Sequence, residues 1–531
     1  MSKLKKVDVC VIGSGAGGGV MAKELGEKGL SVVVLEAGKR FTPVRDYTGA
    51  LIDHERAGKE NRKSLFSVPA MDKITLGNLG ISAPTTAYGV GGTTLRYLAY
   101  MPRLTPDDFR VRSLDGVGED WPISYKDIAP YYRKVELEMQ VAGQNGDPWH
   151  PDVEPYPYPA FEFSYANKII QRGCDKLGIR LWPVPVARLR EPSGGRPACI
   201  QCGECVNGCL SRAKGSIDVT YIPKAERTGN VEVRPESVVT RISVDASGRA
   251  KGVLYFDGKG AQCIQEADII VLSAGAIQSP RILLNSKSPL FPDGLANSSG
   301  TVGKYFMQHV GISATALFEE RIDSFRGFFG GAISHDFAGT KPGRPYVRGW
   351  GIELHSGYRG PASMAVSTPG WGTEHKNFMR KWFGHTAGLV AGGEQLPDMA
   401  NRIELDPEVK DAYGMPVPKL YYKLLENDLL MLKDIEKHIR QILEAAGAIE
   451  VLKMRCQPGE GVHNAGTCRM GRDPRTSVVN GFCRSHDVPN LFIADGSCFV
   501  TGGNANPALT IMALATRAAD YIYEEGKKGD L

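Results

Sequence analysis

The chain has few of the features that direct a protein to a membrane, to export or to nucleic acid. Its longest apolar stretch, "ADIIVLSAGAI" (267–277), is too short to span a bilayer. The N-terminal lysines lead directly into "VDVCVIGSG", without a separate apolar segment or a small-residue cleavage site, so we expect no signal peptide. No basic run exceeds "KLKK", and the net charge is only +5, which argues against nucleic-acid binding.

Cysteine is scarce outside one short cluster. The 531 residues contain 11 cysteines, an odd number that suits a reducing compartment better than a disulfide scaffold. The composition, with 42% hydrophobic and 23% charged residues, is ordinary for a globular protein, and the length favours two or three domains. We therefore expect a soluble, cytoplasmic, enzyme-sized protein, which would be periplasmic only if a signal-bearing partner were exported with it.

The N-terminal region has the pattern of a dinucleotide-binding unit. The apolar, β-branched segment "VDVCVI" (7–12) predicts a buried parallel strand. Gly13, Gly15 and Gly18 follow in the spacing G-x-G-x-x-G, and a second strand, "SVVVLEAG", ends near Glu36. In this context the glycines allow a tight turn, a close approach of the backbone to a pyrophosphate and packing of a helix on the strand, while the acid is placed to bind ribose hydroxyls. Glu36 favours an unphosphorylated ribose, which both FAD and NAD contain, so this unit alone does not distinguish the two cofactors.

Four later segments decide between these cofactors. They are "YGVGGTTLRYLAYMPR" (88–103), "ADIIVLSAGAIQSPRILLNS" (267–286), "GVHNAGTCRMG" (461–471) and "NLFIADGSCFVTGGNANPALTIMALATRAADYI" (490–522). With the N-terminal unit, and in this order, they resemble the glucose–methanol–choline (GMC) oxidoreductases, FAD-dependent enzymes that oxidise alcohols and sugars. The resemblance runs from Val7 to Ile522 and is closest to bacterial FAD sugar dehydrogenases and pyranose oxidases.

The resemblance implies an α/β (α+β) fold with two parts. A Rossmann-like FAD-binding domain would be discontinuous in the sequence, and a substrate-binding domain would be built on a mostly antiparallel sheet. We expect the FAD-binding domain to comprise residues 1–155, 215–315 and 456–531. A cysteine-rich insert and linker would occupy 156–214, and the substrate-binding domain 316–455.

The resemblance also adds residues to the expected FAD site. These are Gly91, Gly92, Thr93, Asp495 and Pro507. For Asp495 a turn-capping role is a compatible alternative. In relatives that resemble pyranose oxidase, the second glycine-rich loop carries a histidine joined covalently to the flavin. The corresponding residue here is Arg96, which cannot form that bond, so we expect noncovalent FAD.

Oxidation of an alcohol by hydride transfer to flavin N5 needs a base for the hydroxyl proton, and a neutral imidazole is suited to this role. His463, in "VHNAGT", matches the position of the family's catalytic histidine. Asn506, in "GGNANPALT", matches its partner, which is histidine or asparagine in the family; Asn504 is the alternative for the amide. His309, in "VGKYFMQHVG", resembles another family landmark, and we expect it to support the FAD-binding domain structurally.

The cysteine cluster "CIQCGECVNGC" (199–209) has the spacing C-x2-C-x2-C-x3-C of bacterial ferredoxins, except that Leu210 replaces the usual proline. An iron–sulfur cluster with three or four irons is one reading. Zinc, or thiols without metal, are the alternatives. The candidate ligands are Cys199, Cys202, Cys205 and Cys209.

The leading hypothesis is FAD-dependent oxidation of a CH–OH group in a sugar, glycoside or polyol, with His463 as the base. Electrons would leave through an iron–sulfur cluster or to an external acceptor, and a small partner subunit or a cytochrome is compatible with this. The alternatives are an oxidase that forms hydrogen peroxide, and a flavin electron-transfer subunit without alcohol chemistry. Trp350, Trp371 and Trp382 are candidates for a sugar-stacking platform, with the core as the alternative.

Overall fold

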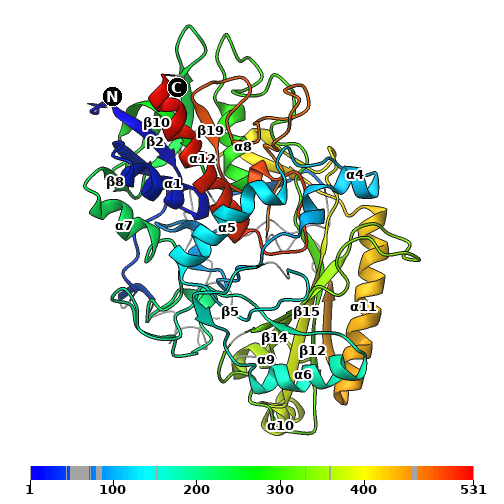
Figure 1. The fold of residues 1–531 in the computed structure, drawn as a ribbon. Coiled ribbons are helices and arrows are strands. Elements are labelled where there is room, and N and C mark those ends of the chain that lie inside the picture. Colours follow the sequence, from blue (N-terminus) through cyan, green and yellow to red (C-terminus); the bar gives the residue numbers. More distant parts are fainter. Residues whose placement is uncertain are drawn as a thin grey trace.

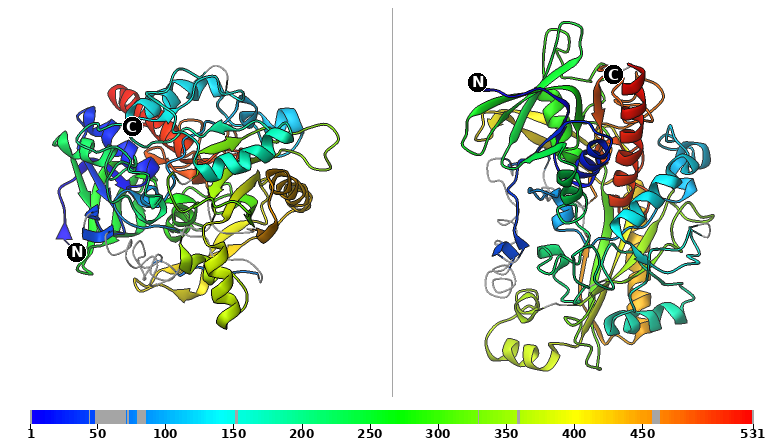
Figure 2. Two further views of the ribbon diagram at one scale, coloured as in Figure 1. Left: turned by 90° about the horizontal axis from the view of Figure 1, so that it is seen from below. Right: turned by 60° about the vertical axis from the view of Figure 1, so that its left-hand side comes forward.

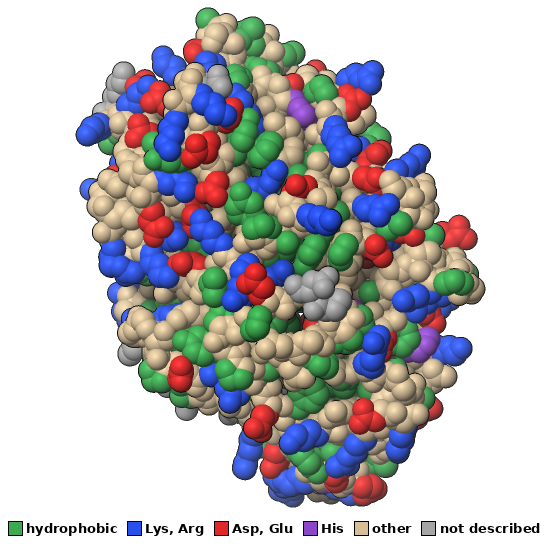
Figure 3. Space-filling model, viewed as in Figure 1, with side chains coloured by type: hydrophobic (Ala, Val, Ile, Leu, Met, Phe, Trp, Pro, Cys, Tyr) green, Lys and Arg blue, Asp and Glu red, His purple; other side chains and the backbone are tan. Residues whose placement is uncertain are grey.

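The computed structural model describes residues 2–43, 45–47, 71, 73–78, 86–150, 153–328, 330–357, 360–456 and 463–529. The molecule is elongated, and both ends of the chain lie at the same end of it, beside the largest sheet (Figures 1 and 2). A second large sheet occupies the opposite half. On the face shown in Figure 3, basic and acidic side chains are interspersed.

The largest sheet has eight strands in the order β8-β3-β2-β11-β10-β9, with β1 and β19 also paired to β11. The pairs β2–β3, β3–β8, β2–β11 and β11–β19 are parallel, and β9–β10 and β10–β11 are antiparallel. The strands are β1 (Ser2–Lys3), β2 (Val7–Ile12), β3 (Val32–Leu35), β8 (Val231–Arg234), β9 (Val238–Val244), β10 (Ala250–Phe256), β11 (Gln262–Leu272) and β19 (Leu491–Ile493).

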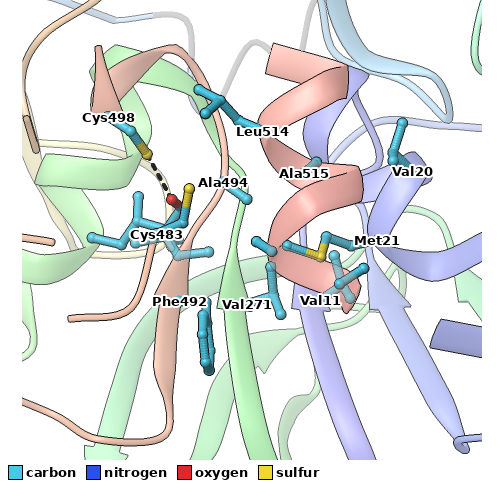
Figure 4. Packing of buried hydrophobic residues seen from close by; sticks show 14 of the residues in the cluster. Val11, Val20, Met21, Val271, Cys483, Phe492, Ala494, Cys498, Leu514 and Ala515 are labelled. Atoms are coloured by element: carbon cyan, nitrogen blue, oxygen red, sulfur yellow. Dashed lines mark hydrogen bonds between the residues drawn. The ribbon is translucent and has the colours of Figure 1, made fainter. Parts of the chain in front are cut away.

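Helices from both ends of the chain cover this sheet. Helix α1 (Ala16–Glu27) packs against α12 (Ala508–Lys528), and α12 packs against α5 (Tyr125–Met139). Figure 4 shows the core between them, in which Val11 and Val271 of the sheet face Ala515 of α12. The predicted role of the third motif glycine is visible here, because a Cβ on Gly18 would lie 1.9 Å from the carbonyl oxygen of Gly13. The helix therefore packs directly on the loop.

The second sheet has six strands in the order β18-β12-β15-β14-β13-β7, and every pair is antiparallel. One of its faces packs on α6 and α11 in a common core that includes Trp350, Ile352 and Leu354. The elements are α6 (Tyr165–Lys176), β7 (Trp182–Pro183), β12 (His309–Leu317), β13 (Ala332–Ser334), β14 (Trp350–Ser356), β15 (Thr386–Glu394), α11 (Glu426–Ala446) and β18 (Glu450–Cys456).

The expected domain limits remain a prediction, but this sheet draws on more of the chain than 316–455. Strand β12 begins at His309, and both α6 and β7 come from the segment 156–214. Of the three tryptophans, Trp350 is fully buried and stacks on Phe337, so it belongs to the core, while Trp371 is 90% exposed.

The remaining elements are short. None of the helices in the described ranges is both long and apolar enough to cross a membrane. Two small sheets have the orders β16-β17-β4 and β5-β6. The elements are β4 (Thr75–Leu76), α4 (Val111–Asp115), β5 (Ala142–Gly143), β6 (Tyr158–Pro159), α7 (Tyr221–Arg227), α8 (Gly275–Asn285), α9 (Pro361–Ala365), α10 (Gly372–Trp382), β16 (Arg402–Lys410), β17 (Pro416–Tyr421), and the 3-10 turns η1 (Gly92–Leu95), η2 (Pro106–Phe109), η3 (Cys205–Asn207) and η4 (Gly496–Cys498).

Candidate active site

The two glycine-rich loops lie against each other at the carboxyl end of β2. Gly13 turns the chain with a φ of +92°, and a Cβ on Gly92 would lie only 2.7 Å from the Cα of Gly15. Side chains at these positions would fill the space beside the N-terminus of α1. Bare backbone at a helix N-terminus is what the phosphates of a dinucleotide require, so the residues present fit FAD.

Glu36 joins these loops from the end of β3. Its buried carboxylate accepts hydrogen bonds from the backbone N–H groups of Ser14 (3.0 Å), Gly38 (2.8 Å) and Gly89 (3.1 Å). The hydroxyl of Ser14 also donates to Glu36 at 2.7 Å and accepts from the N–H of Gly91 at 3.0 Å. Burial raises the pKa of Glu36, against the lowering effect of these donors. Ser14 was missed by the sequence reasoning because it occupies an unspecified position of the motif.

Asp495 holds the start of α8 to the C-terminal segment. Its carboxylate accepts hydrogen bonds from Gly275 N–H at 2.8 Å, from the Ser279 hydroxyl at 2.6 Å and from Ser497 N–H at 2.8 Å. The turn-capping role is therefore present, and a flavin contact stays a prediction. Pro507 caps the N-terminus of α12.

The structure brings the predicted catalytic pair together. His463 has a positive φ of 62°, a conformation that an ordinary side chain rarely adopts. The amide nitrogen of Asn506 donates to His463 Nε2 at 3.3 Å. Asn504, the alternative amide, lies over the six-stranded sheet: its Nδ2 would be 3.4 Å from a Cβ on Gly351, and this atom is buried without a hydrogen-bond partner among the described residues.

The expectation that His309 supports the FAD-binding domain stays a prediction, and the structure adds a contact with the predicted base. His309 is the first residue of β12 in the six-stranded sheet, and its Nδ1 lies 2.9 Å from Nδ1 of His463. Burial lowers the pKa of the His309 ring, against hydrogen bonds with backbone groups of Gly502 and Gly503, which act to raise it as an N–H donated to a carbonyl does. Its Nε2 therefore carries the hydrogen, and its Nδ1 accepts from His463.

This arrangement fixes the tautomer of His463. Because its Nδ1 donates to His309, its Nε2 carries the lone pair and faces Asn506. Burial and the neighbouring His309 lower the pKa of His463 to about 3, against the opposing effect of Glu353. The ring is therefore neutral at ordinary pH, with a proton-accepting nitrogen at the site.

Glu353, on β14, is a site residue that the sequence reasoning missed. Burial acts to raise its pKa, but the His355 ring and a hydrogen bond with Asn506 hold the pKa below its usual value. The carboxylate lies 3.4 Å from His355 Nε2. The segment "WGIELHS" carries no catalytic motif, so only the register of the sheet could have placed this carboxylate.

A buried ion cluster supports the backbone before Asn506. The Arg348 guanidinium contacts Asp108, Asp115 at 3.2 Å and Glu394 at 2.7 Å. Glu394 also accepts the N–H of Gly503 at 3.1 Å. One arginine thus joins η2, the following helix α4 and β15 to the segment that carries the catalytic amide.

The cysteine cluster surrounds a pocket next to the second glycine-rich loop. All four sulfur-bearing residues line it, together with Arg188, Lys214 and Phe328. Lys214 Nζ donates to the carbonyls of Leu95 at 2.8 Å and Cys205 at 2.7 Å, which ties the two loops together. Within the described ranges no three Cys, His, Asp or Glu side chains lie close enough to share one metal ion.

Similarity to known proteins identifies the family of this chain. Family models for GMC oxidoreductases match residues 90–310 and 397–515. The 2-methyl-1,2-propanediol dehydrogenase of Mycolicibacterium austroafricanum is 34% identical, over 97% of this chain and 95% of that protein. The chain belongs to the GMC oxidoreductase family.

Two further GMC-type comparisons agree with this assignment. The fructose dehydrogenase large subunit of Gluconobacter japonicus is 31% identical over 98% of each chain. The formate oxidase of Aspergillus oryzae shares the fold, with a TM-score of 0.71 at 14% identity over 99% of this chain and 100% of that one. The family resemblance, the α/β fold class and the expectation of an oxidoreductase are therefore confirmed.

In this GMC oxidoreductase, Arg96 directly follows η1. Its Nε donates to the carbonyl of Val206 at 3.4 Å, in the cysteine cluster. The residue expected to preclude a covalent flavin bond thus contributes a second contact between the glycine-rich loop and the cysteine pocket. That FAD binds noncovalently stays a prediction.

Proposed function

We propose that this GMC oxidoreductase oxidises the CH–OH group of a sugar, glycoside or other polyol, with His463 Nε2 as the base. The observation that carries the proposal is the array His309–His463–Asn506, which presents one lone pair and one amide donor side by side. FAD, when bound, supplies the acceptor for the hydride of the carbinol carbon. The polyol class is supported by the names of the two related dehydrogenases, one for a diol and one for a sugar.

Each side chain of the array has a separate task. The substrate hydroxyl would take the place of Asn506 as donor to His463 Nε2, and its proton would pass to that nitrogen. The amide of Asn506 would then donate to the developing alkoxide. The carboxylate of Glu353 would stabilise the positive imidazolium. In the assigned tautomer, His309 would keep accepting the Nδ1–H of His463 across their 2.9 Å contact. The ring returns to neutrality when it releases the proton to solvent.

FAD would be held by the residues that the motifs indicate. Gly13, Gly15 and Gly18 would receive the pyrophosphate at the start of α1. Glu36 would bind the ribose hydroxyls, which would replace some of the four hydrogen bonds that its carboxylate accepts from Ser14, Gly38 and Gly89. Gly91, Gly92 and Thr93 would cover the flavin side, with Asp495 and Pro507 at the carboxyl-terminal side. The close contact between the two glycine-rich loops supports this arrangement.

We further propose that the cysteine pocket holds an iron–sulfur cluster through which electrons leave. A single zinc ion needs four ligands about 2.3 Å away, and the thiols of the described chain do not converge on one point. Thiols spaced around a pocket suit a multi-iron cluster instead. Buried Arg188 and Lys214 supply positive charge to offset its negative charge. A partner subunit or a cytochrome would then be the external acceptor.

Anaerobic reduction of the purified holoenzyme tests the catalytic proposal. Polyols should bleach the flavin of the wild type, and His463→Ala should slow bleaching by roughly 10²–10⁴-fold at an unchanged FAD-to-protein ratio. His375→Ala, in α10, is the matched control and should behave as the wild type. Equal rates in His463→Ala would remove this histidine as the base. Peroxide formation in air would favour the oxidase, and a flavin that no polyol reduces would favour the electron-transfer subunit.

Metal analysis tests the cluster. Protein handled without oxygen should contain iron and acid-labile sulfide, and Cys202→Ser should lose both. Cys174→Ala, which removes a buried thiol of α6, is the control that should keep them. Zinc without sulfide, or no metal in the wild type, would contradict the proposal.

A further inference from the structure

Three glycines lie side by side across the centre of the six-stranded sheet. Gly392 of β15 is directly opposite Gly311 of β12 on one side and Gly351 of β14 on the other. The next row on the same face contains Ser313, Val390 and Glu353. A glycine inside a strand weakens it, and often marks a place where a ligand or another backbone comes close.

This face of the sheet is the one that carries the site. Side chains alternate along a strand, so Gly311 shares its face with His309, whose ring contacts His463. A Cβ on Gly351 would lie 3.2 Å from the His335 ring. The opposite face is filled, because a Cβ on Gly393 would lie 2.2 Å from Met431 Sδ of α11.

Above Gly392 the site face is open. A Cβ at this position would meet no atom of the described chain within 4 Å, and its φ lies in the ordinary range. The two neighbours have no such room: a Cβ on Gly311 would lie 2.5 Å from the Ala391 carbonyl oxygen, and one on Gly351 would lie 3.0 Å from that of Ser334. The row is therefore a strip without side chains, with free space over its centre.

Glu353 stands at the edge of this strip. Its side chain is 28% exposed, its Oε2 lies 3.4 Å from His355 Nε2, and the carboxylate also accepts a hydrogen bond from Asn506. A carboxylate can accept about four hydrogen bonds, so acceptor capacity remains on the side of the open strip.

We propose that Gly311, Gly392 and Gly351 form the floor of the substrate pocket, and that Glu353 accepts a hydrogen bond from a second substrate hydroxyl. The enzyme would then select polyols, and among them flat rings that lie on the glycine floor, over monohydric alcohols of the same length. This inference rests on the proposed function and assigns its specificity to residues of the substrate sheet.

The test compares 1,2-propanediol with 1-propanol, which differ by one hydroxyl, and D-glucose, a six-membered ring, with glycerol, a small open-chain triol. The holoenzyme should reduce its flavin with 1,2-propanediol at least tenfold more efficiently than with 1-propanol. Glu353→Gln should raise KM for 1,2-propanediol by roughly 10- to 100-fold and change KM for 1-propanol little. Glu404→Gln, on β16, is the control.

The role of the glycine floor is tested by placing larger side chains at position 392 and comparing a large with a small substrate. Gly392→Leu should block D-glucose while glycerol remains a substrate, and Gly392→Ala should give an intermediate loss. Gly526→Leu, on the exposed side of α12 with no described atom near its Cβ position, is the control. FAD content and the melting temperature show that each variant is folded.

Two results would overturn the inference. One is an equal loss with 1-propanol and 1,2-propanediol in Glu353→Gln, which would assign this carboxylate to His463 alone. The other is an unchanged KM for D-glucose in Gly392→Leu. If none of the four compounds bleaches wild-type flavin, the same comparisons are made on Kd values from visible-spectrum titration. Differential binding without reduction would contradict the proposed function but support the pocket, and absence of binding would contradict both.

Discussion

His463 and His309 face each other through their Nδ1 atoms, 2.9 Å apart. One nitrogen must donate and the other accept, so the two rings cannot both be fully protonated without placing two N–H groups against each other. The backbone of Gly502 and Gly503 hydrogen-bonds the His309 ring, and His309 in turn fixes the tautomer of His463. The following expectations depend on it and on the elements around it.

Loss of His309 should impair turnover more than substrate binding. In His309→Ala, Nδ1 of His463 loses its acceptor, and the ring is free to adopt the tautomer in which Nε2 carries the hydrogen. We expect kcat to fall roughly 10- to 100-fold with little change in KM or FAD content. Steady-state kinetics should also show partial recovery in His309→Gln, whose amide oxygen is again an acceptor. A loss confined to KM would contradict the tautomer argument.

The acid limb of kcat/KM should lie well below the usual histidine pKa near 6.5. The base must be neutral to act, and burial together with His309 lowers the pKa of His463 to about 3, so protonation should not reduce activity between about pH 5 and 8. Glu353 opposes this shift, so Glu353→Gln should move the limb still lower. Stopped-flow reduction from about pH 3 to pH 8 would locate the limb, and a limb at pH 6.5 or above would be incompatible with the array.

Removal of Arg348 should destabilise the fold strongly. Arg348→Met leaves the carboxylates of Asp108, Asp115 and Glu394 buried without their cation, at a cost of about 3–5 kcal/mol. Arg440→Ala removes an exposed partner of Glu436 and should cost less than about 1 kcal/mol. Urea unfolding of both variants at constant FAD concentration makes the comparison. Similar midpoints would show that the buried cluster contributes little.

The contact between the glycine-rich loops can be separated from backbone strain. Gly92 and Gly194 have nearly the same φ, +56° and +57°, but only Gly92 has a close neighbour, the Cα of Gly15 at 2.7 Å from a built Cβ. Alanine at either position therefore carries a similar conformational penalty. We expect Gly92→Ala to lower the FAD-to-protein ratio severalfold and Gly194→Ala to leave it intact. Equal ratios would mean that the loops can separate without loss of cofactor.

The motif residues were predictable because their function depends on short stretches of chain. Gly13, Gly15 and Glu36 follow from a strand–turn–helix–strand pattern, and His463 and Asn506 from segments that resemble the family. The register of the sheets was not predictable in this way. Glu353 reaches the site because β14 pairs with β15 and β13, and these partners are chosen by long-range packing.

The same reason explains why the contact between His309 and His463 was not predicted. The segment of His309 lies in the range expected for the FAD-binding domain. His309 is nevertheless the first residue of β12 in the six-stranded sheet, and its ring contacts His463 on the face that carries the site. The ion cluster of Arg348 could not be predicted either, because its acidic partners, at positions 108, 115 and 394, are far from it in the sequence. Trp350 was uninformative by composition, since a tryptophan suits a sugar platform and a core equally well.

Strand β11 pairs with β2 from the beginning of the sequence and with β19 from near its end. During synthesis, β11 lacks its neighbour β19, and α1 lacks its packing partner α12, until residues 491–493 and 508–528 have left the ribosome. Such distant pairing makes closure of this sheet slow compared with local helix formation. Cofactor capture is consequently a late event in biogenesis, and the nascent chain must remain protected from aggregation with the α12-facing side of α1 exposed until then.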